Sequence, residues 1–166
     1  SPEASEPIRA ISSSAEIDFP DELIIKLEAE ADAVITQITF FYRLGRQKVT
    51  IYGYPVFTRG RSVSTEFRIK TGGANFLPTG TDVEYYYVVR DAASNTFESE
   101  RSTFEYKDPA FDWQRLQDGG LVILWHDRPK RDVERVLAEI APRVEEVKSL
   151  FGLVDASTMK AVIVNS

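Results

Sequence analysis

The stretch that decides the fold is ITQITFFYRL, residues 35–44, in which bulky apolar side chains recur at alternate positions. A period of two places Ile38, Phe40 and Tyr42 on one face of a strand, and Thr39, Phe41 and Arg43 on the other. The stretch VEYYYVVR, residues 83–90, sets Val83, Tyr85, Tyr87 and Val89 against Glu84, Tyr86, Val88 and Arg90 in the same way. Because both faces keep aromatic residues, we expect two central strands whose second face is partly covered by loops or by the following domain.

The period-two pattern extends outward from these strands over Ile8 to Tyr106, and helical periodicity is missing there. Gly, Pro, Asn and Asp separate the apolar runs and supply the dihedral angles that turns need. The predicted strands are residues 15–19, 23–29, 35–44, 49–54, 63–71, 83–91 and 96–106, the last with an irregularity near Glu100. Short strands at this spacing over roughly 100 residues are typical of a β-sandwich.

The architecture changes near Lys107-Asp108-Pro109. We expect a turn at Asp118-Gly119-Gly120, a strand over 121–126 that is covered on both sides, a helix over 130–151 that Pro142 kinks, and an apolar strand over 159–164. Strand, helix and strand predict a β–α–β segment. The predicted core-facing stripe of the helix consists of Val133, Val136, Leu137, Ile140, Val144, Val147 and Leu150.

Composition excludes several classes of function. The net charge of the 166 residues is −6, and the basic residues are interspersed with carboxylates, which argues against nucleic-acid binding and against a membrane-surface role. Cysteine is absent, so disulfides, thiolate nucleophiles and Cys-based metal sites are absent as well. No apolar run approaches the roughly 20 residues of a membrane span, and the opening SPEASEP is polar, as in a flexible lead-in.

Residues of catalytic type are few. His126, the single histidine, precedes Asp127 and would suit a general base, but a strand-end ring that packs or is solvated is the simpler interpretation. Asp91, Asn95 and Glu98 lack the alternating spacing of a calcium loop and indicate a turn. We therefore expect no catalytic, metal-binding or cofactor-binding residue in this chain, and no enzymatic activity.

Aromatic residues offer a different kind of site. Tyr52, Tyr54, Phe57 and the run Tyr85 to Tyr87 would suit a platform for a sugar or a peptide, although core packing accounts for most of them. Exposure of Tyr52, Tyr54 or Tyr86 would favour the platform.

Charged residues and glycines carry less information. We interpret the basic group Arg59, Arg61, Arg68 and Lys70, with Glu66 among them, and the helix residues Glu145 and Glu146 as solvated faces. Gly72-Gly73 and Gly119-Gly120 do not match a phosphate-binding motif.

Two resemblances add to these patterns. Residues 77–81, LPTGT, followed by VEYYY at 83–87 and DAASN at 91–95, resemble the late strands of fibronectin type III or immunoglobulin-like bacterial surface domains. Residues 111–114, FDWQ, the strand that ends in Trp125-His126, the long helix and the apolar strand are similar to the start of peptidase MA-like proteins, which are gluzincin-type zinc peptidases. The zinc-binding His-Glu-x-x-His signature of that family is absent, so no catalytic residue carries over.

These observations predict a mainly β chain, an immunoglobulin-like β-sandwich followed by a short β–α–β segment. The expected divisions are a lead-in at 1–7, the sandwich at 8–107, and a linker with an incomplete α/β segment at 108–166. The leading hypothesis is a non-catalytic N-terminal structural module of a bacterial extracellular metallopeptidase-like protein, with the rest of that peptidase-like domain as its partner. The alternatives are a surface module that binds polysaccharide or protein, and an oligomer formed through the open sheet edge.

Overall fold

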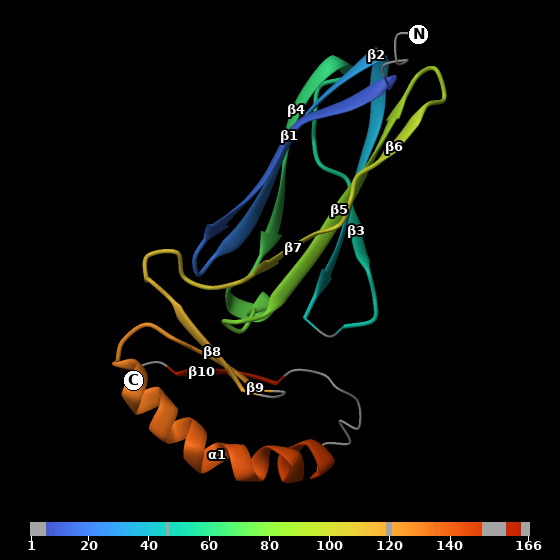
Figure 1. Cartoon of the computed structure of the whole chain (residues 1–166). Helices are drawn as coiled ribbons and strands as arrows, with labels where there is room; N and C mark the ends of the chain where they lie inside the picture. Colours follow the sequence, from blue (N-terminus) through green and yellow to red (C-terminus); the bar gives the residue numbers. More distant parts are fainter. Residues whose placement is uncertain (1–5, 46, 119–120, 151–158, 164–166) are drawn as a thin grey trace, which may run out of the picture. The chain divides into compact units, whose positions relative to one another are not determined.

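The computed structural model describes residues 6–45, 47–118, 121–150 and 159–163, and the chain forms two compact units, Ser1–Asp108 and Pro109–Ser166 (Figure 1). The first unit contains β1 (Ile8–Asp18), β2 (Glu22–Leu44), β3 (Ile51–Gly53), β4 (Gly60–Lys70), a 3-10 turn (Gly73–Asn75), β5 (Asp82–Asp91), β6 (Thr96–Glu98) and β7 (Ser102–Glu105). The second contains β8 (Gln114–Asp118), β9 (Leu121–Trp125), α1 (Lys130–Leu150) and β10 (Met159–Ile163). The predicted mainly β fold, sandwich-like with a β–α–β segment, is confirmed.

Strand β2 belongs to both layers of the first unit. Its first half pairs with β1 and with β4, whereas its second half pairs with β3 and with β5, and β6 and β7 both pair with β5. Figure 1 shows β1 and β4 on one side of this unit and β3 and β5 on the other. Because one strand is shared, all seven strands join into a single antiparallel sheet that folds over its own core.

A change of phase in β2 makes this sharing possible. In the first half the odd-numbered residues Leu23, Ile25 and Leu27 are buried, and in the second half the even-numbered Ile38 and Phe40 are buried. The pairing with β5 shifts register between Ile35 and Gln37, where the burial pattern changes. A one-residue irregularity of this kind exchanges the two faces of a strand, so both halves of β2 contribute their apolar face to one core.

Three strand predictions need correction. The predicted strand 15–19 is the end of β1, which begins at Ile8. Residues 23–29 and 35–44 are parts of one strand of 23 residues, because polar Glu28, Glu30 and Asp32 still fit an alternating pattern and do not end it. The predicted strand 96–106 is two strands, β6 and β7, which end and begin on either side of Glu100. The predicted faces of the two central strands are confirmed: Phe40, Val83, Tyr85, Tyr87 and Val89 are buried.

A buried polar cluster closes one end of the first unit. The Tyr106 side chain is 1% exposed, and its hydroxyl lies 3.2 Å from Thr71 Oγ1. Thr71 Oγ1 in turn donates to the Pro20 carbonyl at 3.0 Å. These bonds connect the β1–β2 turn, the end of β4 and the end of β7, and they satisfy hydroxyl groups that would be costly to bury without partners.

In the second unit, α1 packs on a three-stranded sheet in the order β10, β9, β8. Strand β10 is parallel to β9, as a β–α–β unit requires, and all five residues of β9 are buried, as predicted. Strand β8 was not predicted, because its sequence QRLQD contains a single apolar residue, Leu116. That residue contacts the cluster of β9 and α1.

The predicted stripe of α1 is partly correct. Val133 and Leu137 are buried, but Ile140 is 39% exposed. The side chains of Val144, Val147 and Leu150, the turn at Gly119-Gly120 and the predicted helix end lie outside the described residues. The helix continues through Pro142.

Candidate functional site

The outer face of the layer formed by β3, β2 and β5 collects aromatic and polar side chains into registered rows. Phe41 pairs with Tyr52 on β3 and with Tyr86 on β5. The next rows along β2 and β5 are Thr39 with Val88, and Gln37 with Arg90. Directly opposed residues of antiparallel strands lie on the same face of the sheet, so these side chains form one continuous surface.

A stack of side chains forms the base of this surface. The Phe41 and Tyr86 rings are nearly parallel, at 9°, with centroids 4.8 Å apart. The Arg101 guanidinium carbon lies 4.5 Å from the Tyr86 ring centroid, and Arg101 and Arg43 both contact the Glu84 carboxylate, at 3.6 and 3.0 Å. The stack therefore turns the faces of Phe41 and Tyr86 toward neighbouring side chains, and both rings are half-buried.

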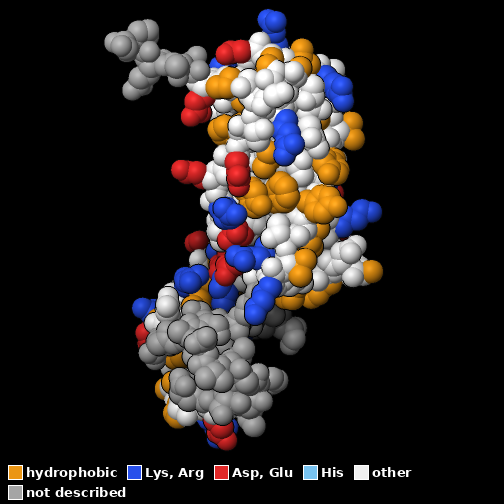
Figure 2. All heavy atoms as spheres, turned by 90° about the vertical axis from the view of Figure 1, so that its right-hand side faces the viewer, with side chains coloured by type: hydrophobic (Ala, Val, Ile, Leu, Met, Phe, Trp, Pro, Cys, Tyr) orange, Lys and Arg blue, Asp and Glu red, His pale blue; other side chains and the backbone are white. Residues whose placement is uncertain are grey.

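Tyr52 and Tyr54 project beyond that stack. They are 62% and 61% exposed, although large aromatic side chains normally bury most of their area. The Tyr52 ring lies 6.4 Å from Phe41 and 6.0 Å from Tyr54, the second contact being edge-to-face at 75°. Figure 2 shows hydrophobic side chains gathered over the middle of the face that it presents, with basic and acidic side chains around them.

The sequence Tyr52-Gly53-Tyr54 explains how β3 presents both rings. Gly53 faces inward, and a Cβ atom there would lie 2.5 Å from the Phe67 ring. That ring is held by stacking on Phe40, with centroids 5.2 Å apart. Only glycine lets β3 approach this closely, and with Gly53 facing inward, Tyr52 on β3 and Tyr54 directly after it face outward.

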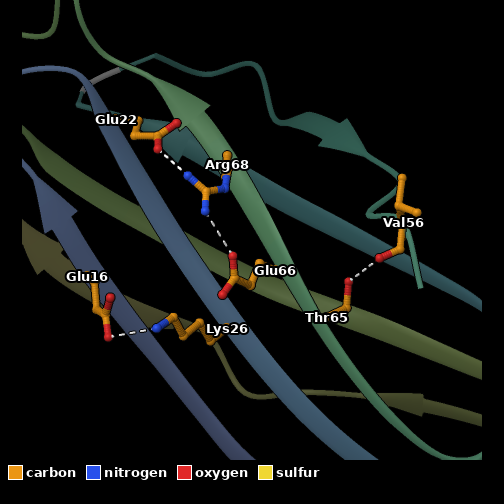
Figure 3. Close-up of polar contacts among 7 residues, drawn as sticks. All are labelled: Glu16, Glu22, Lys26, Val56, Thr65, Glu66 and Arg68. Carbon is orange, nitrogen blue, oxygen red and sulfur yellow. Dashed lines mark hydrogen bonds and ion pairs between the residues drawn. The ribbon is translucent and has the colours of Figure 1, made fainter. Parts of the chain in front are cut away.

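The segment after Tyr54 is tied down as well. The Thr65 hydroxyl on β4 donates to the Val56 carbonyl at 2.9 Å, as the close-up in Figure 3 shows. Pro55, which follows Tyr54 in the sequence, is buried. The two exposed tyrosines therefore lie on a fixed segment.

A shallow hollow of about 300 Å³ lies beside the tyrosines. Its volume is at the lower end of the range for small-molecule sites, roughly 300 to 1,000 Å³. The lining residues are Gln37, Thr39, Phe41, Tyr52, Tyr54, Val88 and Arg90. Rings, an amide, a hydroxyl and a guanidinium thus converge on one surface without any arrangement for nucleophilic or metal chemistry among them.

The aromatic residues singled out in the sequence divide between this surface and the core. Tyr85 and Tyr87 are buried and Phe57 packs against the core, whereas Tyr52, Tyr54 and Tyr86 lie on the outer face. Phe41, Gln37, Thr39, Val88 and Arg90 were not recognised as site residues, although alternation already placed most of them opposite the core. The missing information was the register that brings β3 and β5 to the two sides of β2.

Asp91, Asn95 and Glu98, which were considered as calcium ligands, do not form a calcium site. The Asp91 carboxylate accepts hydrogen bonds from Ala93 N at 3.0 Å, from Asn95 N at 2.8 Å and from Asn95 Nδ2 at 2.9 Å. These bonds lower the pKa of Asp91, and the bond from the Asn95 side chain has the largest effect. The carboxylate is thus occupied in closing the turn after β5, while Glu98 lies on β6 opposite Val88.

His126 lies in the second unit between two aromatic rings. Its ring stacks on Phe111 at 4.0 Å and 12°, and meets Trp113 edge-to-face at 4.6 Å. Trp125 Nε1 donates to the Arg128 carbonyl at 3.0 Å and fixes the turn into α1. In the described ranges, no group of three or more His, Asp or Glu side chains could hold a metal ion.

Arg68 of β4 and Lys26 of β2 form ion pairs on the surface of the first unit (Figure 3). Arg68 pairs with Glu22 and, at 3.1 Å, with Glu66, while Lys26 pairs with Glu16 at 3.1 Å. Acidic neighbours raise the pKa of Arg68. This charged face is formed by β1, by the first half of β2 and by β4. Within the part of the chain that is described, no helix is both long and apolar enough to cross a membrane.

No protein-family model and no curated protein matches the chain. Among solved structures, BhCBM56, a carbohydrate-binding module, matches with a TM-score of 0.44 and 11% identity, over 62% of this chain and 97% of that one. OgpA from Akkermansia muciniphila matches at 0.44 and 8% over 62% of this chain and 29% of its own length. Its catalytically inactive form in complex with an O-glycopeptide matches at 0.44 and 8%, over 63% of this chain and 30% of that one. At this level the likeness carries no argument about function, and it supports neither the fibronectin nor the peptidase resemblance.

Proposed function

We propose that the chain is a non-catalytic binding module that holds a glycan on the outer face of β3, β2 and β5. The observation that carries the proposal is the exposure of Tyr52 and Tyr54, at 62% and 61%, on either side of Gly53, which brings β3 close to the sheet. A module of this kind would act at the cell surface or outside the cell, where polysaccharides are found.

The chemistry of the surface suits a sugar. A pyranose ring has an apolar C–H face and a rim of hydroxyl groups, so it is bound by an aromatic face together with hydrogen-bonding groups beside it. Tyr52 and Tyr54 supply the aromatic faces, and Gln37 and Thr39 in the hollow supply an amide and a hydroxyl. A purely apolar protein partner would leave those polar groups without hydrogen bonds, which is costly.

The test is binding of the 166-residue chain to a panel of soluble polysaccharides, measured by affinity electrophoresis and calorimetry. We expect the double variant Tyr52→Ala/Tyr54→Ala to bind at least about tenfold more weakly, which corresponds to about 1.4 kcal/mol. Phe76→Ala is the matched control, since Phe76 is 73% exposed and lies outside the site. Equal binding by the double variant and the control, or no binding of any glycan by the native chain, would reject the proposal.

A place at the N-terminal side of a metallopeptidase-like domain is a second proposal, and it is compatible with the first. It is supported by the parallel pairing of β9 and β10 around α1, which is how an α/β domain begins. The encoded sequence after Ser166 provides the test: a His-Glu-x-x-His helix is expected there, and a stop codon or an unrelated domain would reject this proposal.

A further inference from the structure

We propose that the glycan is anionic and that Arg90 receives its carboxylate or sulfate group. This inference rests on the proposed function, because it concerns the polar end of the same surface. The ligand of the hollow is then an acidic polysaccharide.

Arg90 contributes a positive charge to this surface. Its side chain is exposed, lines the hollow and, among the described residues, makes no ion pair and no hydrogen bond. The lining residues include no carboxylate. A guanidinium presents a planar set of donors that matches a carboxylate or sulfate with two parallel hydrogen bonds, so an anionic sugar would satisfy it directly.

The other arginines of this face show what a structural role looks like. Arg43 and Arg101 both contact the Glu84 carboxylate, which lies on the other side of the Phe41–Tyr86 row from Arg90. Arg101 also lies over the Tyr86 ring. Their charge is neutralised and their position is fixed inside the protein. Within the described part of the chain, the Arg90 side chain has neither kind of contact, although it lies on the same strand as Glu84 and on the same face.

The spacing defines where the charge of the ligand must lie. Tyr52 lies in the same row as Phe41 and Tyr86, so Arg90 is four residues along the strands from it, roughly 13 Å, and two strands across, roughly 10 Å. Thr39 and Val88 form the row between that of Tyr52 and that of Arg90, and both line the hollow. A single sugar ring does not bridge this span, so the ligand is an oligosaccharide or polymer that stacks on Tyr52 and Tyr54, crosses β2 and carries an anion at the Arg90 end.

The charge of the whole chain makes the inference easy to test. With a net charge of −6, the protein repels polyanions in general, so binding of an acidic polymer requires a specific cation. Glu98 is exposed on β6 opposite Val88, on the same face as the hollow but outside its lining. It opposes an anionic ligand, and its removal should strengthen binding.

The experiment compares matched ligands that differ in charge. Polygalacturonate is measured against its fully methyl-esterified form, and dextran sulfate against dextran, by calorimetry with the native 166-residue chain at low and at moderate salt. We expect the charged member of at least one pair to bind about tenfold more tightly. The pair that shows the preference identifies carboxylate or sulfate as the group bound.

Variants then assign the preference to one residue. Arg90→Gln should abolish the difference between the paired ligands, Arg90→Lys should keep part of it, and Glu98→Gln should increase it. Arg131→Gln is the charge-matched control, since the Arg131 side chain is 81% exposed on α1. Thermal unfolding of each variant establishes that it is folded.

Each outcome decides a separate question. If the native chain binds glycans but does not distinguish the paired ligands, or if Arg90→Gln keeps the full preference, the anionic ligand is rejected and glycan binding stands. If no glycan binds, the proposed function itself fails. Loss of the preference in Arg131→Gln as well would reduce the effect to net charge and also reject the role of Arg90.

Discussion

The two outer faces of the sheet are built on the same strand, yet they differ in how their side chains are satisfied. On the face of β1, β4 and the first half of β2, Arg68 is paired with Glu22 and Glu66, and Lys26 with Glu16. On the face of β3, β5 and the second half of β2, two tyrosines are more than half exposed, and the Arg90 side chain has no ion pair or hydrogen bond among the described residues. The ion pairs named on the first face join side chains of the chain itself, whereas the second face leaves two rings and a cation accessible to a ligand.

The largest expected effect comes from the core beneath both faces. Phe40 is fully buried and contacts Phe67 and Tyr87, with ring centroids at 5.2 and 5.7 Å. We expect Phe40→Ala to lower the free energy of unfolding by about 3 to 5 kcal/mol, because it leaves a cavity where the layers meet. Denaturant unfolding measures this, and a change below about 1 kcal/mol would contradict the shared core.

Gly53→Ala tests how the aromatic face is held. The added methyl group would overlap the Phe67 ring, so we expect a loss of about 1 to 3 kcal/mol in the free energy of unfolding, together with weaker glycan binding. Gly73→Ala serves as a comparison, because Gly73 has open space around its Cβ position but a φ of 59°. That variant should affect stability alone. Unchanged binding by Gly53→Ala would contradict the role assigned to β3.

Tyr106→Phe compares a buried tyrosine with the exposed ones. Removal of the Tyr106 hydroxyl takes away its bond to Thr71 inside the core, so we expect a loss of about 1 kcal/mol in the free energy of unfolding. The same substitution at Tyr52 should leave stability unchanged, since that ring is 62% exposed. Denaturant unfolding of both variants measures the difference. Equal changes in the free energy of unfolding would contradict the assignment of Tyr106 to the core and of Tyr52 to the surface.

Acid should weaken the turn next to Arg90. Hydrogen bonds lower the pKa of Asp91 in the folded chain, so the unfolded chain binds the proton more readily. The stabilisation is therefore present above the ordinary pKa of an aspartate and is lost as the pH falls through the lowered value. Stability measured from neutral to strongly acidic pH should fall less steeply in Asp91→Asn than in the native chain. Parallel curves would show that Asp91 contributes no pH dependence.

The smallest effect is expected on the charged face. Arg68→Gln removes two ion pairs between solvent-exposed groups, and such pairs contribute little to stability. We expect thermal unfolding and glycan binding to remain within experimental error of the native chain. A clear loss of glycan binding would mean that the two faces are not independent.

The sequence predicted the fold more fully than the site. Alternation assigned the two faces of residues 35–44 and 83–90 correctly because each residue alternates independently of its neighbours in space. Alternation did not predict that β2 is continuous. The phase of the pattern changes near Ile35 and Gln37, and this register shift arises from the pairing with β5. Alternation also missed β8, whose polar sequence pairs with the buried strand β9 on one side.

The site depended on information that no local pattern contains. Tyr52 and Tyr54 were recognised as candidates, and their exposure met the condition set for a binding platform. Their meeting with Phe41, Tyr86 and Arg90 follows from a register between segments that are up to about 50 residues apart in the sequence. Turn geometry and strand order fix that register, and neither is encoded in the alternation itself.

The passage of β2 through both layers has a mechanical consequence. In a sandwich of separate sheets, a force applied to one layer reaches the other through side-chain contacts, which yield one at a time. Here the strand that pairs with β1 is covalently continuous with the strand that carries Phe41. We therefore expect a pull on a glycan held at the tyrosines to be shared along the backbone of β2 with the hydrogen bonds of both layers, so that the module resists being peeled apart under load.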